Sequence, residues 1–340
     1  MYMDAIRRAK VSIRIEQFLF TPDSVGKPIV DLLIKKATEG VSIKCMFDSM
    51  GSINLAQSEH VQRMTKAGIK VKFFNWIFPF STHNKKIWYF RDHRRILIID
   101  REVMMTGGLC IGKRMEDWRD THIRVEGQVV SQATYIFDVS WSRIYKKRTM
   151  RLGGQYRTGT DRFSLITHAP LLRERYLYYR LIDAMRCAEK SIDITVPYFL
   201  PDRRIIRVLL LAKKRGVRVR ILIPEVSDHR FVDYGSGTYF NQLLKKGIEI
   251  YRYKAMIHAK TVSIDNDWGL IGTLNFDNIS LRYNFEIGLI TTNRLCIQEL
   301  NELFEQDTKN SNKLSFEGWQ RRSLFTKFME LVVWPIRKFL

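Results

Sequence analysis

AIRRAKVSIRIEQF at residues 5–18 is followed 179 positions later by AMRCAEKSIDITVP at residues 184–197. Both stretches place their alanines and a Ser-Ile pair at matching positions. Further pairs follow at the same offset, namely Pro22-Asp23 with Pro201-Asp202 and AGIKV (67–71) with KGIEI (246–250). Agreement at one fixed offset over this length predicts a chain made of two similar halves.

Each half has the pattern of helices alternating with strands. Apolar residues recur at helical spacing over 29–38 and 206–214, and Gly40 and Gly216 follow as candidate helix ends. Short runs rich in β-branched residues come next, VSIKCMF at 41–47 and VRVRILI at 217–223. The alternation predicts an α/β fold with a mixed, mostly parallel sheet covered by helices in each half.

A glycine-rich linker at 145–161 separates the halves, so we expect domains at 1–150 and 151–310 and a tail at 311–340. The tail mixes apolar and aromatic residues with basic ones: Arg321, Arg322, Lys327, Arg337 and Lys338. A basic amphipathic helix of this kind either lies on an anionic bilayer or docks against the protein. The aromatic run FFNWIFPF at 73–80 has two readings as well, a membrane-interface segment or a core strand that ends in a loop.

The charge of the chain points to an anionic partner. Lysine and arginine number 57 against 35 acidic residues, which gives a formal net charge of +22 over 340 residues. Nucleic acid and an anionic membrane surface both attract such a protein, and charge alone does not choose between them. No apolar run reaches the 18 to 20 or so residues of a spanning helix, so we do not expect the chain to cross a bilayer by itself.

The cysteines give no sign of a metal or disulfide framework. Cys45, Cys110, Cys187 and Cys296 are widely separated and form no CxxC pair. We therefore expect no metal and no other cofactor, and a chain kept on the reducing, cytoplasmic side of the membrane.

The residues that carry chemistry occur twice, as HRRILIID at 93–100 and HAKTVSID at 258–265. Residues two apart on a strand face the same side, so His93 lies beside Arg95, and His258 beside Lys260. An imidazole can attack phosphorus or protonate a leaving oxygen, while a neighbouring cation holds the other phosphate oxygens. Two such pairs predict phosphate-transfer chemistry that needs no metal.

These octapeptides resemble the duplicated HxKxxxxD motif of the phospholipase D superfamily. The likeness continues after each copy, because Gly107 and Cys110 recur as Gly272 and Asn275 at the offset of 165 that separates the histidines. The acidic segments WRDTHIRVEG (118–127) and LRYNFEIGL (281–289) also look alike. The resemblance implies two phospholipase D-type α/β/α halves packed about a pseudo-two-fold axis.

The resemblance also implies roles for single residues. His93 is expected to be the nucleophile that forms a phosphohistidine, and His258 the general acid and base. Arg95, Lys260 and Asn275 are expected to hold the phosphate, and the site is completed by four acidic residues. Asp100 and Asp265 are the motif aspartates of the catalytic set, and Asp120 and Glu286 are expected to orient the histidines.

Two residues depart from the motif. Arg95 stands where the motif has lysine, and Cys110 stands where the second half has Asn275. Arginine keeps the charge but has a different geometry, so an altered substrate fit or a lower activity is one expectation. A second is an anionic-membrane binding protein whose site no longer works.

Within the superfamily, three sequence segments most resemble those of bacterial cardiolipin synthases: VGKPIVDLL (25–33), VPYFLPD (196–202) and NFDNISLRYNFEIGL (275–289). That resemblance implies transfer of a phosphatidyl group between two phosphatidylglycerols, with glycerol released, by a peripheral membrane enzyme without an obligate protein partner. A phospholipase D-type hydrolase or a nuclease is the alternative. Many such synthases carry leading membrane helices, so this chain is either a shorter type or lacks a leading segment.

Overall fold

The computed structural model describes residues 1–76, 89–143, 162–170 and 174–337. The chain forms two compact units. The first comprises Met1–Asp117, His122–Glu174 and Tyr283–Ile287, and the second comprises Trp118–Thr121, Arg175–Arg282 and Gly288–Leu340. Each unit therefore contains a short segment that belongs, in sequence, to the other half. The domain boundaries expected from the sequence stay a prediction, and the expected linker lies outside the described residues.

The elements follow the chain in alternating order. Those up to residue 170 are α1 (Tyr2–Arg8), β1 (Ser12–Gln17), α2 (Gly26–Thr38), β2 (Ser42–Asp48), α3 (Ile53–Ala56), α4 (Glu59–Lys66), β3 (Lys70–Phe74), β4 (Arg95–Ile99), β5 (Val103–Gly107), a 3₁₀ turn η1 (Lys113–Met115), β6 (His122–Glu126), α5 (Val129–Arg143) and β7 (Phe163–His168).

The remaining elements, from residue 174 onward, repeat this alternation. They are α6 (Tyr176–Cys187), β8 (Ser191–Thr195), α7 (Arg203–Lys214), β9 (Arg218–Pro224), α8 (Arg230–Lys245), β10 (Glu249–Tyr253), β11 (Thr261–Ile264), β12 (Trp268–Gly272), α9 (Asn278–Arg282), β13 (Glu286–Thr291), α10 (Arg294–Lys309), β14 (Ser311–Lys313), α11 (Phe316–Gln320) and α12 (Leu324–Val333).

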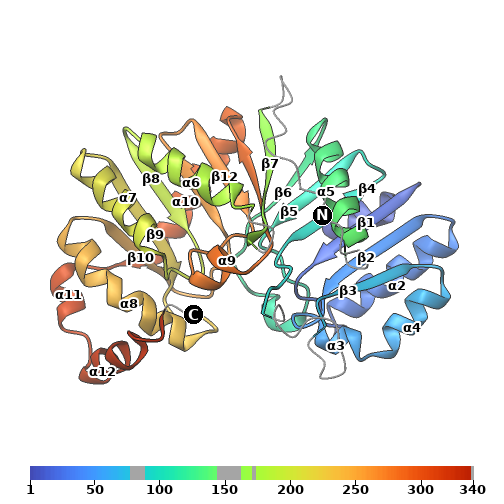
Figure 1. Cartoon of the computed structure of the whole chain (residues 1–340), viewed down its shortest axis with the longest axis horizontal. Helices are drawn as coiled ribbons and strands as arrows, with labels where there is room; N and C mark the ends of the chain where they lie inside the picture. The colour runs from blue at the N-terminus through green and yellow to red at the C-terminus, as the bar shows by residue number, and fades with distance from the viewer. Residues whose placement is uncertain (77–88, 144–161, 171–173, 338–340) are drawn as a thin grey trace. The chain divides into compact units, whose positions relative to one another are not determined.

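The first unit is a sheet between two layers of helix. Its strands have the order β3-β2-β1-β4-β5-β6, with α2 and α4 beside β2 and β3 and with α5 beside β4 to β6 (Figure 1). Alternate residues of β1 face opposite layers, since Ile13 and Ile15 join the core formed with α1 and α2 while Arg14 pairs with Asp138 of α5. The period-2 pattern of β1 thus builds both interfaces.

The second unit repeats this plan. Its strands run β14-β10-β9-β8-β11-β12-β13, and β8 has the central place that β1 has in the first unit. Asp193, the counterpart of Arg14 on β8, pairs with Arg220 of β9, which also pairs with Glu305 of α10. The prediction of two similar α/β/α halves is confirmed, and their arrangement about an axis stays a prediction.

The balance of strand directions differs from the expected one. Among the strand pairs given above, the parallel ones join three neighbouring strands in each sheet, β3-β2-β1 and β10-β9-β8. The other pairs given above are antiparallel. "Mostly parallel" was therefore wrong, although "mixed" was right. Two of the antiparallel pairs, β4-β5 and β11-β12, come from a tight turn after each motif strand, where Asp100-Arg101 and Asp265-Asn266 adopt positive φ values of 53° to 61° and reverse the chain.

The helix ends agree with the sequence pattern. Helices α2 and α7 end at Thr38 and Lys214, and both glycines that follow, Gly40 and Gly216, have a φ near +90° with open space around the missing side chain. A residue with a left-handed backbone conformation at this position ends a helix. Glycine adopts this conformation without strain, whereas most other residues do not. The glycines therefore fix where β2 and β9 can begin.

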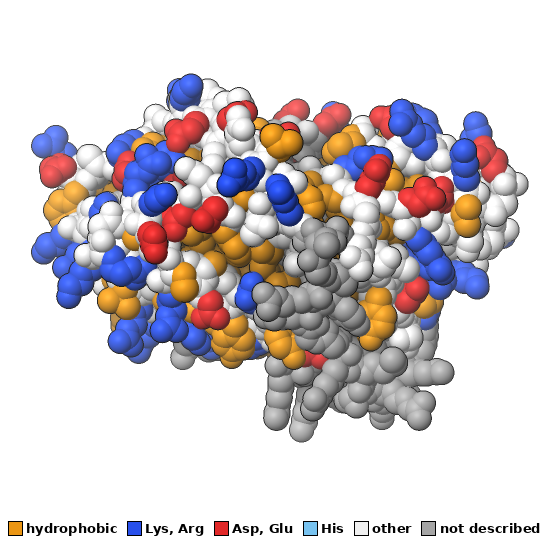
Figure 2. Space-filling view, turned by 90° about the horizontal axis from the view of Figure 1, so that it is seen from above, with side chains coloured by type: hydrophobic (Ala, Val, Ile, Leu, Met, Phe, Trp, Pro, Cys, Tyr) orange, Lys and Arg blue, Asp and Glu red, His pale blue; other side chains and the backbone are white. Residues whose placement is uncertain are grey.

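Helices α11 and α12 pack against α8, and no helix in the described parts of the chain is long and apolar enough to span a membrane. Residues 77–80, which are half of the aromatic segment 73–80, lie outside the described residues. Figure 2 shows basic side chains spread over one face of the molecule with acidic ones among them. On this face the positive charge lies at the surface, where an anionic partner can reach it.

Candidate active site

His93 of the first motif faces a buried carboxylate. Its Nδ1 lies 2.9 Å from Oε1 and 3.0 Å from Oε2 of Glu286, whose side chain is fully buried. The backbone N–H of His93 donates to the carbonyl of Phe285, 2.9 Å away. The segment Tyr283–Ile287, which carries Glu286, is part of the first unit, as His93 is. The histidine is thus held by backbone and side chain of the same segment.

Arg95 lies against the other nitrogen of this ring. Its Nη2 is 3.1 Å from Nε2 of His93 and donates to Sγ of Cys110 at 3.3 Å, while its Nη1 donates to the His93 carbonyl at 2.9 Å. A guanidinium has hydrogens to donate and no lone pair to offer, so Nε2 of His93 is the acceptor. The imidazole is then neutral, with its proton on Nδ1 toward Glu286.

A buried cluster of charges lies next to this pair. Arg94 forms ion pairs with Asp92 at 2.9 Å and Glu16 at 2.6 Å, and its guanidinium lies 5.5 Å from the ring of Phe285. Burial raises the pKa of Glu16 well above its usual range, although the Arg94 charge acts to lower it. Buried charges of this kind need partners, so the cluster holds the backbone on both sides of His93 in place.

His258 of the second motif has the same kind of partner. Its Nδ1 is 2.8 Å from Oδ2 of Asp120, and its backbone N–H donates to the Arg119 carbonyl at 2.7 Å. Burial raises the pKa of Asp120, but the charge and hydrogen bond of His258, the Lys260 charge and the Thr121 backbone N–H together outweigh burial, and the pKa falls to about 2. Arg119 is anchored in turn by Asp307 of α10 at 2.8 Å.

Aromatic rings and a buried cation surround His258. Trp118 lies 5.0 Å and Tyr198 6.5 Å from its ring, and Nζ of Lys260 donates to the His258 carbonyl at 2.6 Å. Asn275 is buried as well. The second unit therefore offers an imidazole, an ammonium and an amide, which together suit the oxygens of a phosphate.

The motif aspartates lie elsewhere. Asp100 follows the last residue of β4, so it stands at the far end of that strand from His93. Its carboxylate accepts hydrogen bonds from the backbone N–H of Lys10, Val11 and Ser12 at 2.7 to 2.8 Å. Asp265 accepts from the corresponding residues of the second half: Glu189, Lys190 and Ser191. We interpret both as clamps on the central strands rather than as members of the reacting group.

Several residues around the histidines were missed by the sequence reading. Phe18 contacts the His93 ring edge-on at 4.7 Å, and Trp118 and Tyr198 lie near His258. Phe18 and Tyr198 each follow a central strand within a few residues, at the edge where the motif histidine stands. Their position just after a central strand was the sequence signal that could have identified these two residues. In the described residues no group of three or more His, Cys, Asp or Glu could hold a metal ion.

Comparisons with known proteins identify the family of the chain. The family model described as "Cardiolipin synthase, PLD-like domain" matches residues 2–141 and 181–308. The probable cardiolipin synthase YwiE of Bacillus subtilis is 34% identical over 96% of this chain and 67% of that protein. Cardiolipin synthase 1 of Bacillus cereus is 32% identical over 96% of this chain and 67% of that protein.

Solved structures share the fold. Phosphatidylserine synthase of Haemophilus influenzae has a TM-score of 0.73 at 14% identity, with 99% of this chain and 92% of that chain covered. Polyphosphate kinase of Porphyromonas gingivalis has a TM-score of 0.60 at 12% identity, with 97% and 53% covered. The family model and the identity to curated relatives confirm the resemblance seen in the repeated motif, and the chain belongs to the cardiolipin synthase family of phospholipase D-type phosphatidyltransferases.

Proposed function

We propose that this protein makes cardiolipin by transferring a phosphatidyl group from one phosphatidylglycerol to another through a phosphohistidine on His93. One observation carries the proposal: each motif histidine has its Nδ1 against a buried or nearly buried carboxylate, which leaves Nε2 as the reacting atom on both. Two imidazoles oriented alike are what a double displacement at one phosphorus requires. The proposal includes that both act on the same phosphate.

His93 is the better nucleophile of the two. The Arg95 contact selects the neutral ring with a lone pair on Nε2, and Glu286 raises the basicity of that ring through the Nδ1 proton. When a phosphate enters, the guanidinium can turn from Nε2 to the phosphate oxygens and so release the lone pair. Arg95 then both guards the nucleophile and binds the substrate.

His258 is the acid and base. Asp120 keeps its negative charge to a low pH, since its pKa is about 2, and a carboxylate beside the ring favours the protonated imidazolium. Lys260 and Asn275 stand on the same unit and serve the phosphate oxygens. The second motif thus supplies the proton that the leaving alcohol needs.

The reaction then balances in two steps. Nε2 of His93 attacks phosphorus, the bond from phosphorus to the head-group glycerol oxygen breaks, and glycerol leaves with the proton of His258. A head-group hydroxyl of a second phosphatidylglycerol gives its proton to His258 and attacks the same phosphorus. The phosphorus–nitrogen bond breaks, cardiolipin leaves, and His93 is restored.

The site of action is proposed to be the cytoplasmic face of the cell membrane, with the protein bound at the surface and with anionic phospholipids as substrates. The formal charge of +22 supports an anionic surface. The same positive charge also supports the second candidate function, a hydrolase or nuclease that uses the same histidines on another phosphodiester.

The test is to incubate the protein with phosphatidylglycerol vesicles and, in parallel, with single-stranded DNA. We expect cardiolipin and glycerol in equal amounts and intact DNA. Cleavage of the DNA without formation of cardiolipin would favour the nuclease. Formation of phosphatidic acid instead of cardiolipin would favour the hydrolase. His258→Ala leaving every property unchanged would favour a non-enzymatic membrane-binding protein.

The nucleophile is tested separately with phosphatidylglycerol labelled at phosphorus. The reaction is stopped with a denaturant at alkaline pH, where phosphohistidine survives, and the labelled peptide is mapped. We expect the label on the peptide that contains His93, and no label in His93→Ala. Label on the peptide that contains His258 would reverse the two roles.

A further inference from the structure

Helix α12 presents apolar side chains to solvent. Leu324, Phe328, Leu331 and Val332 stand at i, i+4, i+7 and i+8 and so share one face, with Phe325 beside them. Their exposed fractions run from 44% for Val332 to 82% for Leu324. A surface helix normally has the reverse pattern, with its polar face outward.

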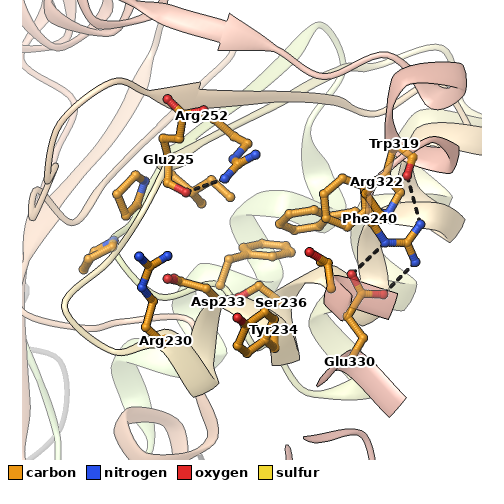
Figure 3. A pocket seen from close by; sticks show the side chains of 15 residues that line it. Glu225, Arg230, Asp233, Tyr234, Ser236, Phe240, Arg252, Trp319, Arg322 and Glu330 are labelled. Carbon is orange, nitrogen blue, oxygen red and sulfur yellow. Dashed lines mark hydrogen bonds and ion pairs between the residues drawn. The ribbon is translucent and has the colours of Figure 1, made fainter. Parts of the chain in front are cut away.

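The opposite face of α12 is the one in contact with the protein, and it is partly polar. Glu330 and Val333 are buried there, and Glu330 forms an ion pair with Arg322 at 2.6 Å. Figure 3 shows this pair beside Trp319 at a cavity of about 210 Å³. The helix therefore places its carboxylate inward and its leucines and phenylalanines outward.

This orientation is fixed by close packing on α8. A side chain at Gly237 would come within 2.7 Å of Oε1 of Glu330, and one at Gly235 within 3.5 Å of Val333. The absence of a side chain at Gly237 makes room for the Glu330 carboxylate. Because α12 is seated this way, it cannot turn its apolar face inward without breaking the buried ion pair.

A basic groove adjoins the end of α12. Helices α7 and α8 and the segment after α12 supply its cations: Arg203, Arg207, Lys213, Lys214, Lys246 and Arg337. No acidic residue is among the described residues that line it. Arg337 links groove and helix, since its guanidinium lies 5.0 Å from the ring of Trp334 and donates to Thr238 at 3.1 Å.

We propose that α12 is the membrane-contact helix of this protein, with its apolar face among the upper acyl chains of an anionic phospholipid bilayer and the groove cations against the head groups. An interfacial helix of this kind buries its apolar side about 5 to 10 Å deep and gains further from anionic lipid. The proposal deepens the proposed function and rests on it in one respect, that the substrates are bilayer lipids.

Charge argues against a second copy of the chain as the occupant of this face. A symmetric dimer through α12 would bring two copies of the same basic groove together. Repulsion between like charges opposes that contact, whereas anionic head groups relieve it. The same cations therefore favour a lipid surface over self-association.

The test measures co-sedimentation of the full chain with vesicles of phosphatidylglycerol and phosphatidylcholine. We expect wild-type protein to bind vesicles with phosphatidylglycerol at least tenfold more tightly than vesicles of phosphatidylcholine alone. Replacing Phe325, Phe328 and Leu331 by serine should weaken binding at least tenfold. These side chains point to solvent, so the variant should keep its melting temperature and its rate on detergent-dispersed substrate.

Leu295→Ser is the matched control, because Leu295 on α10 is 73% exposed and Leu331 is 70% exposed. It should bind vesicles like wild-type protein. Unchanged binding by the triple variant would overturn the inference, as would a wild-type dimer that the triple variant converts to a monomer without loss of binding. His258→Ala should bind normally. Wild-type protein that binds these vesicles but makes no cardiolipin would reject the proposed function and leave the membrane contact standing.

Discussion

Arg95 donates a hydrogen bond from Nη2 to Sγ of Cys110 at 3.3 Å, so the two departures from the repeated motif contact one another. The second half has Lys260 and Asn275 at the corresponding positions. The first half combines a larger cation with a smaller residue at these two positions, and the second half combines a smaller cation with a larger residue. The departures thus form one compensated change rather than two separate losses.

The pair predicts a non-additive effect on activity. Arg95→Lys should lower the rate of cardiolipin formation about tenfold, because the contact with Nε2 of His93 is lost. Cys110→Asn should also lower it, because the amide crowds the guanidinium. The double variant should be faster than the product of the single effects predicts, by about fivefold or more, in a double-mutant cycle of initial rates. Independent effects would show that the contact is without consequence.

Glu286 is predicted to act through His93. Glu286→Gln keeps the shape but should favour the wrong tautomer of the ring, and kcat should fall on the order of 100- to 10,000-fold with little change in KM. Steady-state kinetics of transfer check this, and Asp31→Asn, which alters an exposed pair with Arg63, is the control. A raised KM at constant kcat would mean that Glu286 serves binding instead.

Asp120 is predicted to make stability depend on acid pH. Its pKa is about 2 in the folded protein against an ordinary 3.8, so the folded state holds the charged form more strongly than the unfolded state does. This contribution, about 2 kcal/mol, is complete above pH 4 and is lost as the pH falls toward 2. Urea unfolding of wild-type protein and Asp120→Asn should differ most near pH 5 and converge near pH 2. A difference that stays constant with pH would rule out this linkage.

Asp100 and Asp265 are predicted to stabilise the fold with little effect on chemistry. Alanine at either position leaves three backbone N–H groups without their acceptor and should lower the free energy of unfolding by about 1 to 3 kcal/mol. The kcat of the folded fraction should stay within about twofold. A hundredfold lower kcat at unchanged stability would instead place these carboxylates in the reaction.

The sequence predicted what local patterns determine. Helix α7 ends before Gly216, which the sequence marks as a candidate helix end. Its start at Arg203 needed the cap of Asp202, whose carboxylate accepts from two backbone N–H groups. The direction of strand pairing was misjudged because the reversing turns at Asp100 and Asp265 were counted only as motif residues.

The sequence did not predict which carboxylate pairs with which motif histidine. Glu286 is 28 positions from His258 in sequence but pairs with His93, and Asp120 is near His93 in sequence but pairs with His258. The periodicity of the sequence cannot show that Trp118–Thr121 belongs to the second unit and Tyr283–Ile287 to the first. The cluster around Arg94 was missed for the same reason, because Glu16 and Asp92 look like ordinary charges until the fold brings them together.

That exchange of segments makes each catalytic imidazole depend on a stretch of chain encoded far from it. A fragment such as residues 1–150 would carry His93 without Glu286, and the fragment that follows would carry His258 without Asp120. We therefore expect two fragments split at the linker to be inactive when separate, and turnover to need both of them together.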